Sequence, residues 1–393
     1  GFIVSREQNY QLELRSGICC VEDSDASDIN SLLDRANMAL KTIKVKGAAQ
    51  WKFYDHTMRD KLLREKDLEI RMEKALADGE FLVYIQPKYW VGTRALAGGE
   101  ALVRWKSPDQ GFLSPGEFIP LFEKNRFIVK LDQFMFTSVC GLLRQWLDAG
   151  IEPRPLSVNV SRMQFHTPDF VERYIRIKSQ YAIPDGLLEL EFTESIFFDN
   201  VALLSSAVHE LRRAGIKCSI DDFGAGYSSL NVLKALPVSV LKLDGMFFRT
   251  AKDDEQAKIV IRNIMRMAGE LKMATVAEGV ETHEQVAFLE TTGCDIIQGY
   301  VFARPMPAAE FTELQCQATW RADRCINLAV FAPPASVGLT PAPTWGRGFP
   351  FGGFSPYPDI CSRFPGARGI RGSGILRPAS FSSYSERCGR QPL

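Results

Sequence analysis

The chain has 393 residues, of which 46% are hydrophobic and 11% aromatic, so it holds enough apolar material for a large core. Basic and acidic residues number 47 each, and the resulting net charge of zero argues against a broadly basic protein that binds DNA or RNA polymers. No apolar run is long enough to predict a membrane segment, and no secretory signal opens the chain. The nine cysteines show no C-x-x-C spacing, so we expect reduced thiols and a cytoplasmic location. Because the first residue is not Met, we also expect the chain to be a piece of a longer protein, which could be tethered to a membrane.

Residues 1–55 read as a small α/β segment ahead of the main domain. The pattern predicts a strand over residues 11–20, a helix over 29–43 and a strand over 51–54. A second amphipathic helix follows at 56–77, and its charged faces are typical of a linker helix between two domains.

Residues 78–320 show a regular alternation of short β-rich runs with amphipathic helical stretches. Such alternation predicts parallel strands covered by helices. Eight runs in about 240 residues fit a closed, TIM-like (β/α)₈ barrel better than a doubly wound open sheet. The eight runs are 81–86, 98–103, 156–160, 187–192, 217–221, 239–243, 274–278 and 295–299.

Residues 321–393 are a tail of different composition. Within 331–393 there are ten glycines, ten prolines and seven arginines but no lysine, without helical or strand periodicity. We predict a disordered or non-native extension, and the alternative is a basic arm that contacts an anionic partner.

Acidic and amide side chains fall at or next to the carboxyl ends of successive predicted strands. Because strand ends of a barrel meet at one mouth, residues far apart in sequence are expected to converge there. A lysine lies in the sixth run and a glutamine in the eighth. The acids and amide are Glu100, Asn159, Glu191, Asp221, Asp222 and Glu278, and the other two are Lys242 and Gln298.

So many carboxylates within a few ångströms repel one another, and divalent cations remove that repulsion. Carboxylate and amide oxygens suit Mg²⁺ or Mn²⁺, and the lack of His and Cys at these positions argues against zinc. The adjacent Asp221 and Asp222 can place one carboxylate between two ions, an arrangement that suits attack on a phosphodiester. Lys242 can hold the nucleophilic water or offset the excess negative charge.

A series of short motifs runs through roughly residues 78–320. It begins with Glu100-Ala101-Leu102, followed by Val103-Arg104-Trp105. The later stretches are 114–120 (SPGEFIP), 159–161 (NVS), 191–194 (EFTE), 221–229 (DDFGAGYSS), 242–244 (KLD), 278–281 (EGVE) and 298–300 (QGY). In this order the motifs resemble the EAL-domain phosphodiesterases of cyclic di-GMP, a family named after the first motif.

The resemblance implies two divalent cations, Mg²⁺ or Mn²⁺, and a role for each matching residue. Its ligands for the first cation are Glu100, Asn159, Glu191 and Asp221, and for the second Asp221, Asp222 and Glu278. Either Glu278 or a metal-bound hydroxide is the base, and Lys242 and Gln298 orient the water. Glu194 anchors the loop 222–229. The implied substrate contacts are Gln86 (at the end of the first predicted strand), Leu102, Arg104, Asp244, Glu281, Gln298 and Tyr300.

The helix 29–43, with Asn37-Met38-Ala39, and the strand 51–54 (WKFY) follow a second pattern. Through them residues 1–55 resemble the C-terminal remnant of a GGDEF domain, the diguanylate cyclase fold. The chain starts after the position of the signature loop, so the resemblance does not imply cyclase activity.

The implied function is hydrolysis of cyclic di-GMP to linear pGpG by two-metal activation of water, in bacterial signalling, with a homodimer through the barrel. The alternatives are a non-catalytic cyclic di-GMP receptor that acts through a protein partner and a phosphohydrolase for a different diester. The stretch 122–126 departs from the family pattern, and we expect it to open a helix away from the mouth.

Overall fold

The computed structural model describes residues 2–4, 9–11, 14–21, 28–43, 50–194, 196, 201–224, 237–250 and 254–322. The predicted tail lies almost wholly outside these residues. The predicted loop 222–229 is described only as far as Gly224.

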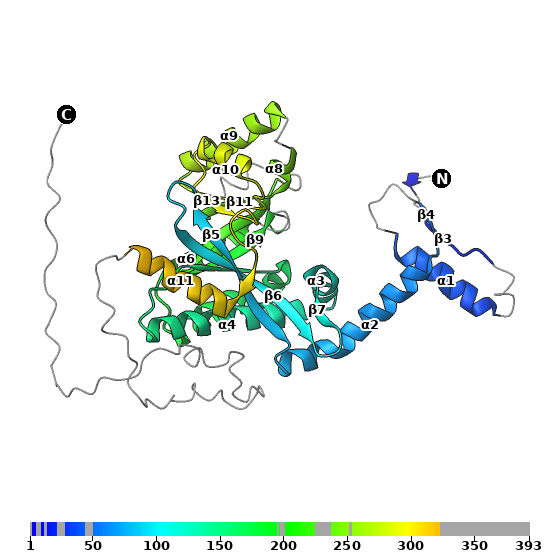
Figure 1. The fold of residues 1–393 in the computed structure, drawn as a ribbon. Helices are drawn as coiled ribbons and strands as arrows, with labels where there is room; N and C mark the ends of the chain where they lie inside the picture. The colour runs from blue at the N-terminus through cyan, green and yellow to red at the C-terminus, as the bar shows by residue number, and fades with distance from the viewer. Residues whose placement is uncertain are drawn as a thin grey trace, which may run out of the picture. The chain divides into compact units, whose positions relative to one another are not determined.

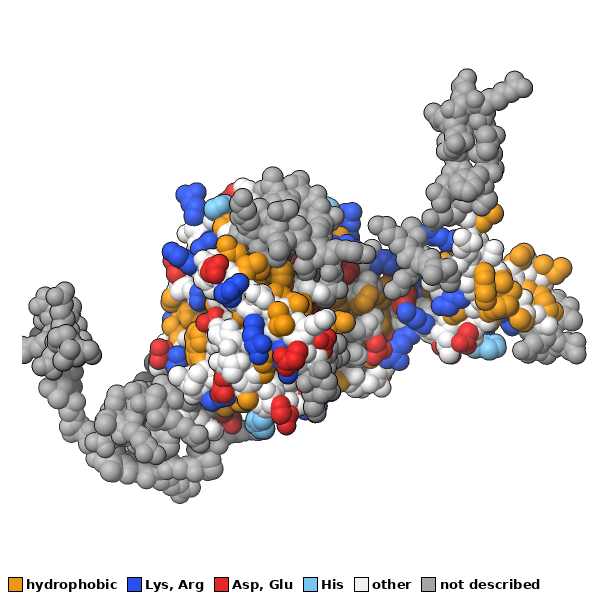
Figure 2. Space-filling view, turned by 90° about the horizontal axis from the view of Figure 1, so that it is seen from above, with side chains coloured by type: hydrophobic (Ala, Val, Ile, Leu, Met, Phe, Trp, Pro, Cys, Tyr) orange, Lys and Arg blue, Asp and Glu red, His pale blue; other side chains and the backbone are white. Residues whose placement is uncertain are grey.

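The N-terminal segment is built from two strand pairs and one helix. Strands β1 (Phe2–Val4) and β2 (Asn9–Gln11) are antiparallel, whereas β3 (Ser16–Ile18) and β4 (Trp51–Phe53) are parallel. Helix α1 (Ile29–Lys41) begins after Asp28, whose side chain accepts a hydrogen bond from the Asn30 N–H. Apolar side chains lie exposed on this segment (Figure 2). They include Ile29, Leu33, Trp51 and Phe53.

Helix α2 (His56–Ala77) occupies the residues predicted for the linker helix. Its N-cap is Asp55, whose side chain accepts a hydrogen bond from the Thr57 N–H. Gly79, which follows the helix, has a φ of +75°, a conformation that glycine adopts without steric cost.

Eight strands are hydrogen-bonded in a closed ring, which confirms the TIM-like barrel and excludes the open sheet (Figure 1). Each strand overlaps one of the eight predicted runs. The strands are β5 (Phe81–Trp90), β6 (Leu96–Ser107), β8 (Leu156–Asn159), β9 (Leu188–Thr193), β10 (Lys217–Phe223), β11 (Val240–Leu243), β12 (Ala274–Ala277) and β13 (Ile296–Gln298).

The prediction of parallel strands throughout was wrong for the first strand. β5 runs antiparallel to both of its neighbours in the ring, β6 and β13, whereas successive strands from β6 through β8 to β13 are parallel. The reason is the connection: only residues 91–95 separate β5 from β6, too few for the crossover that parallel strands need. Gln86 therefore lies inside a ten-residue strand and not at its end, and it pairs with Glu100 on β6.

Helices cover the outside of the barrel, as Figure 1 shows. Two short strands, β7 (Gly111–Leu113) and β14 (Met306–Pro307), extend the sheet beside β6 and β5. The helical elements after β6 are α3 (Pro115–Lys124), α4 (Ile128–Asp148), η2 (Arg162–His166), α5 (Phe170–Gln180), α6 (Val201–Arg213), α8 (Met246–Thr250), α9 (Glu255–Glu270), α10 (His283–Glu290) and α11 (Ala308–Ala322).

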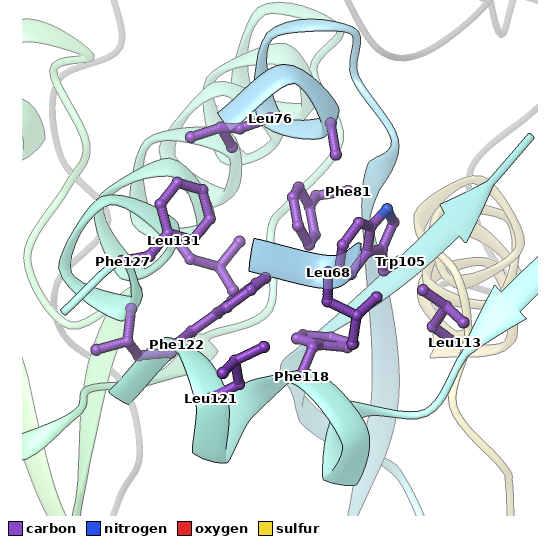
Figure 3. Packing of buried hydrophobic residues seen from close by; sticks show 12 residues of the cluster. Leu68, Leu76, Phe81, Trp105, Leu113, Phe118, Leu121, Phe122, Phe127 and Leu131 are labelled. Atoms are coloured by element: carbon purple, nitrogen blue, oxygen red, sulfur yellow. The ribbon is translucent and has the colours of Figure 1, made fainter. Parts of the chain in front are cut away.

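An aromatic cluster fastens the β5–β6 pair to the helices beside it (Figure 3). Phe81 from β5 and Trp105 from β6 pack with ring centres 4.9 Å apart, and Phe122 from α3 lies 5.8 Å from Trp105. Leu68 from α2 belongs to the same buried cluster. The indole of Trp105 also donates a hydrogen bond to Glu80, which satisfies its one polar group. These contacts fix the two strands that carry Gln86, Glu100 and Arg104.

Candidate active site at the barrel mouth

Lys242, in β11, is the centre of a group of four carboxylates from four other strands or strand ends. Its side chain is 1% exposed. Burial alone would lower the pKa of the Lys242 ammonium, but the surrounding carboxylates, led by Asp221, raise it well above its ordinary value. Nζ lies 2.6 Å from Glu191 Oε2, 2.7 Å from Glu278 Oε1, 3.0 Å from Asp221 Oδ1 and 3.6 Å from Glu100 Oε2.

Glu100 is held on both of its oxygens by amide side chains. Asn159, the last residue of β8, donates from Nδ2 to Oε1 at 2.7 Å, and Gln298 donates from Nε2 to Oε2 at 2.6 Å. Gln298 also donates to Gln86 Oε1 at 3.2 Å. Burial and the neighbouring Glu191 raise the pKa of Glu100. The register of β5 against β6 thus brings Gln86 to the mouth although it is not a strand-end residue.

Asp221, Asp222 and Glu278 form a cluster whose carboxylate oxygens lie within 4.8 Å of one another. Asp222 has a φ of +53°, an uncommon value for a residue other than glycine, and its N–H donates to Asp221 Oδ1 at 3.0 Å. Burial, Asp221 and Asp244 raise the pKa of Asp222 to about 6, and burial raises that of Glu278 well above its ordinary value. The cluster therefore resists carrying three negative charges unaided.

Two buried oxygens of the mouth make no hydrogen bond among the described residues. They are Oε1 of Gln298 and Oε1 of Glu278, and the Glu278 oxygen lies 2.7 Å from Lys242 Nζ in an ion pair. A buried acceptor without a donor is unfavourable unless water or an ion supplies the missing contact. Together with five carboxylates against two lysines, these oxygens are a chemical environment that fits divalent cations.

Lys88 is a site residue that the sequence analysis missed. It is 6% exposed, and its Nζ lies 2.8 Å from Glu191 Oε1 and 2.7 Å from Ser157 Oγ. Although burial alone would raise the pKa of Glu191, the ammonium groups of Lys242 and Lys88 hold it below its ordinary range. The predicted run ended at residue 86, but the period of two along β5 puts Lys88 on the same face as Gln86.

Two further predicted residues, Leu102 and Arg104, lie along β6 on the same face as Glu100. Tyr84 pairs with Leu102 and Leu82 with Arg104, two and four residues along from the Gln86–Glu100 pair. The guanidinium carbon of Arg104 lies 5.6 Å from the centre of the Tyr84 ring, a cation–π contact. Tyr84 was not among the predicted residues.

The remaining predicted residues lie in loops that follow the strands. Asp244 accepts a hydrogen bond from the Met246 N–H at 2.6 Å, and the exposed Glu281 donates its backbone N–H to Gln285 at 2.7 Å. Tyr300 is 53% exposed, with the guanidinium carbon of Arg304 4.6 Å from its ring centre. Glu194 accepts a hydrogen bond from the Gly224 N–H at 3.0 Å.

The family model described as "EAL domain" matches residues 70–305, more than half of the chain. The chain belongs to the EAL family. Among curated proteins, this EAL chain is 32% identical over 286 residues to the bifunctional diguanylate cyclase/cyclic di-GMP phosphodiesterase MucR of Pseudomonas aeruginosa, covering 73% of this chain and 42% of MucR. It is 32% identical over 287 residues to the cyclic di-GMP phosphodiesterase PdeR of Escherichia coli, covering 72% of this chain and 43% of PdeR.

Solved structures of EAL proteins share the fold and carry ligands. The cyclic di-GMP complex of the PaMucR phosphodiesterase aligns with a TM-score of 0.60 at 35% identity, covering 62% of this chain and 99% of that one. The EAL enzyme Bd1971, bound to cAMP and cyclic di-GMP, aligns with a TM-score of 0.61 at 30% identity, covering 66% and 73%.

The EAL chain spans less than half the length of these curated relatives. Residues 1–55 precede the EAL match, so the GGDEF remnant stays a prediction, as do the homodimer and the cytoplasmic location. No helix in the described ranges is both long enough and apolar enough to cross a membrane.

Proposed function

We propose that this EAL domain hydrolyses cyclic di-GMP to linear pGpG in bacterial second-messenger signalling. The observation that carries the proposal is the ring of oxygen donors around Lys242, with Arg104 farther along the face of β6 that carries Glu100. Both EAL structures described above contain cyclic di-GMP, which supports this substrate over another diester.

Two divalent cations, Mg²⁺ or Mn²⁺, fit the donor set of the mouth. Glu100, Asn159, Glu191 and Asp221 would hold the first cation, and Asp221, Asp222 and Glu278 the second. When bound, such a pair activates water and stabilises the charge that develops on the attacking and leaving oxygens of a phosphodiester.

The chain's own residues would bind the substrate and receive the proton. Arg104 is suited to a phosphate because a guanidinium can donate two parallel hydrogen bonds to it, and the Tyr84 ring holds the guanidinium in place. Glu278 is the candidate proton acceptor, since it is a carboxylate of the cluster with Asp221 and Asp222 and its Oε1 forms an ion pair with Lys242.

One water adds to one phosphorus, one P–O3′ bond breaks, and the released 3′-hydroxyl takes a proton. The product is the linear dinucleotide with a 5′-phosphate. Gln86, Leu102, Asp244, Glu281, Gln298 and Tyr300 would line the path of the substrate.

A product assay tests the proposal. The purified chain should convert cyclic di-GMP to pGpG with Mg²⁺ or Mn²⁺ and stop when a chelator is added. Glu100→Ala and Asp221→Ala should each lose far more than tenfold in rate, because both are proposed metal ligands. If the chain binds cyclic di-GMP tightly in the presence of the cation but forms no product over hours, the receptor alternative would be favoured. A generic chromogenic diester cleaved in preference to cyclic di-GMP would favour a different phosphohydrolase.

A further inference from the structure

We propose that Lys88 is a positioning residue that sets the divalent-cation affinity of the mouth through Glu191. The inference rests on the proposed function, because it takes Glu191 as a metal ligand. Lys88 contacts Glu191 and is not proposed to contact the cations or the substrate.

The two oxygens of Glu191 are held by two different ammonium groups. Lys88 contacts Oε1 at 2.8 Å and Lys242 contacts Oε2 at 2.6 Å, and the Glu191 side chain is fully buried between them. Lys242 is shared among four carboxylates, whereas Lys88 forms an ion pair with Glu191 alone within the described residues. The effect of Lys88 is therefore specific to one ligand.

Lys88 is itself fixed by contacts across the barrel interior. It comes from β5, and it reaches Ser157 on β8 and Glu191 on β9, which are not the neighbours of β5 in the ring. Its partner on β6 is Gly98, so no side chain at that position competes for the space. The Ser157 hydroxyl, 2.7 Å from Nζ, gives the ammonium a second fixed partner. The Lys88 side chain is therefore held by its backbone on β5 and by Ser157 at its ammonium. A side chain fixed in this way can fix the rotamer of the Glu191 carboxylate that it contacts.

Two effects of Lys88 on a bound cation oppose each other. Its positive charge repels the cation, but its hydrogen bond to Glu191 Oε1 holds the ligand in one orientation. Groups that orient metal ligands typically change metal affinity by about 10–100-fold when they are removed. Lys88 approaches Glu191 on Oε1, so the carboxylate stands between the ammonium and the oxygen that Lys242 holds. We therefore expect orientation to outweigh repulsion.

The test measures the dissociation constant of Mn²⁺ for the full chain in the absence of nucleotide. The concentration of unbound Mn²⁺ is monitored by its electron paramagnetic resonance signal. Lys88→Met, which keeps the length of the side chain but removes the ammonium, should weaken binding by about 10–100-fold. Unchanged or tighter binding would overturn the proposal, since it would mean that repulsion dominates or that Lys88 has no effect on the ligand.

Lys178→Met is the matched control for the loss of a buried lysine. Lys178 is 7% exposed, and its Nζ donates to the Ala214 carbonyl at 2.6 Å and contacts Asp185, outside the mouth. This variant should lose stability but keep the Mn²⁺ affinity of the parent chain. An equal loss of affinity in both variants would show a general effect of destabilisation and would contradict the inference.

Ser157→Ala decides the question if Lys88→Met does not fold. It removes the hydroxyl that anchors Lys88 and leaves Glu191 and both ammonium groups in place, so it should weaken Mn²⁺ binding by a few fold. No change in this variant would overturn the positioning role.

The readout separates this inference from the proposed function. Loss of Mn²⁺ affinity in a chain that never hydrolyses cyclic di-GMP supports the role of Lys88 and refutes the phosphodiesterase. If the parent chain hydrolyses cyclic di-GMP but Lys88→Met binds Mn²⁺ as tightly as the parent, the phosphodiesterase is supported and the role of Lys88 is refuted.

Discussion

Lys242 and Glu191 form an ion pair in which Nζ lies 2.6 Å from Oε2 and neither side chain is more than 1% exposed. A buried pair of this kind adds little net stability, but removing one partner leaves an uncompensated charge in a low-dielectric interior. Lys242 also contacts Asp221 and Glu278, so its loss affects several carboxylates at once.

Lys242→Met should therefore destabilise the chain most when no divalent cation is present. In the presence of a chelator, urea unfolding should show that the free energy of unfolding of Lys242→Met is about 3–5 kcal/mol lower than that of the parent chain. Mn²⁺ should restore part of that loss, because cations can neutralise the same carboxylates. Lys258→Met removes a partly exposed lysine that pairs with the exposed Glu255 on α9, and it should change little. Equal effects of the two substitutions would contradict a central role for the Lys242 charge.

Tyr84 should affect substrate binding through Arg104 and not through the chemistry. Replacing it by leucine removes the ring over which the guanidinium lies, a contact worth about 0.5–2 kcal/mol. For Tyr84→Leu we expect KM for cyclic di-GMP to rise by about two- to tenfold with kcat nearly unchanged. Tyr181→Leu, at the C-cap of α5, is the matched control and should alter neither constant. A fall in kcat at constant KM would count against the proposed role of Arg104.

The barrel and its mouth could be predicted because each depends on local patterns. A β-rich run of five or six residues between helical stretches predicts a strand, and the closed ring then brings the strand ends together. That is how Asn159, Glu191 and Asp221 were placed near one another from residues far apart in sequence.

The direction of β5 could not be read from the same patterns. The predicted runs 81–86 and 98–103 left a gap of eleven residues, whereas the strands extend to Trp90 and from Leu96. The short connection that makes β5 antiparallel was therefore hidden. Lys88 was missed for the same reason, and its partners on β8 and β9 depend on tertiary packing.

The stretch 122–126, which departs from the EAL family pattern, was expected to open a helix, and this expectation was wrong. It closes α3 and does not open a helix, and Glu123 accepts a hydrogen bond from Ser161 Oγ at 3.0 Å. Ser161 is two residues after Asn159, so this stretch contacts the segment that leaves the mouth. The sequence contains no periodic signal for such a contact between a helix end and a loop.

Asp132 on α4 should make stability depend on pH. It is buried and accepts hydrogen bonds from the Ser161 N–H at 3.0 Å and from Gln164 Nε2 at 3.2 Å. Burial raises the pKa of Asp132 to about 7, and nearby Glu123 adds to the rise. Because an unfolded aspartate titrates near pH 4, the native chain binds more protons between about pH 4 and pH 7.

The contribution of Asp132 is therefore full in acid and is lost as pH rises through about 7, by up to about 4 kcal/mol. Asp132→Asn keeps the acceptor but does not titrate. The difference in unfolding free energy between the parent chain and this variant, measured in urea at pH 5, 6, 7 and 8, should fall with pH. A difference that rises with pH would show that the two donors stabilise the carboxylate more than burial destabilises it.

Arg126 offers a substitution that should stabilise the chain without touching the mouth. It is exposed and has a φ of +67°, a left-handed conformation that costs residues with a Cβ atom about 1–2 kcal/mol. Glycine adopts this conformation freely but loses more backbone entropy on folding, so Arg126→Gly should raise the free energy of unfolding by up to about 1 kcal/mol. Arg126→Ala keeps the strain and should give no gain. Thermal and urea unfolding of the three chains would measure this, and the mouth should keep its Mn²⁺ affinity in all of them. If glycine were no better than alanine at this position, the backbone strain would not be the factor that limits stability there.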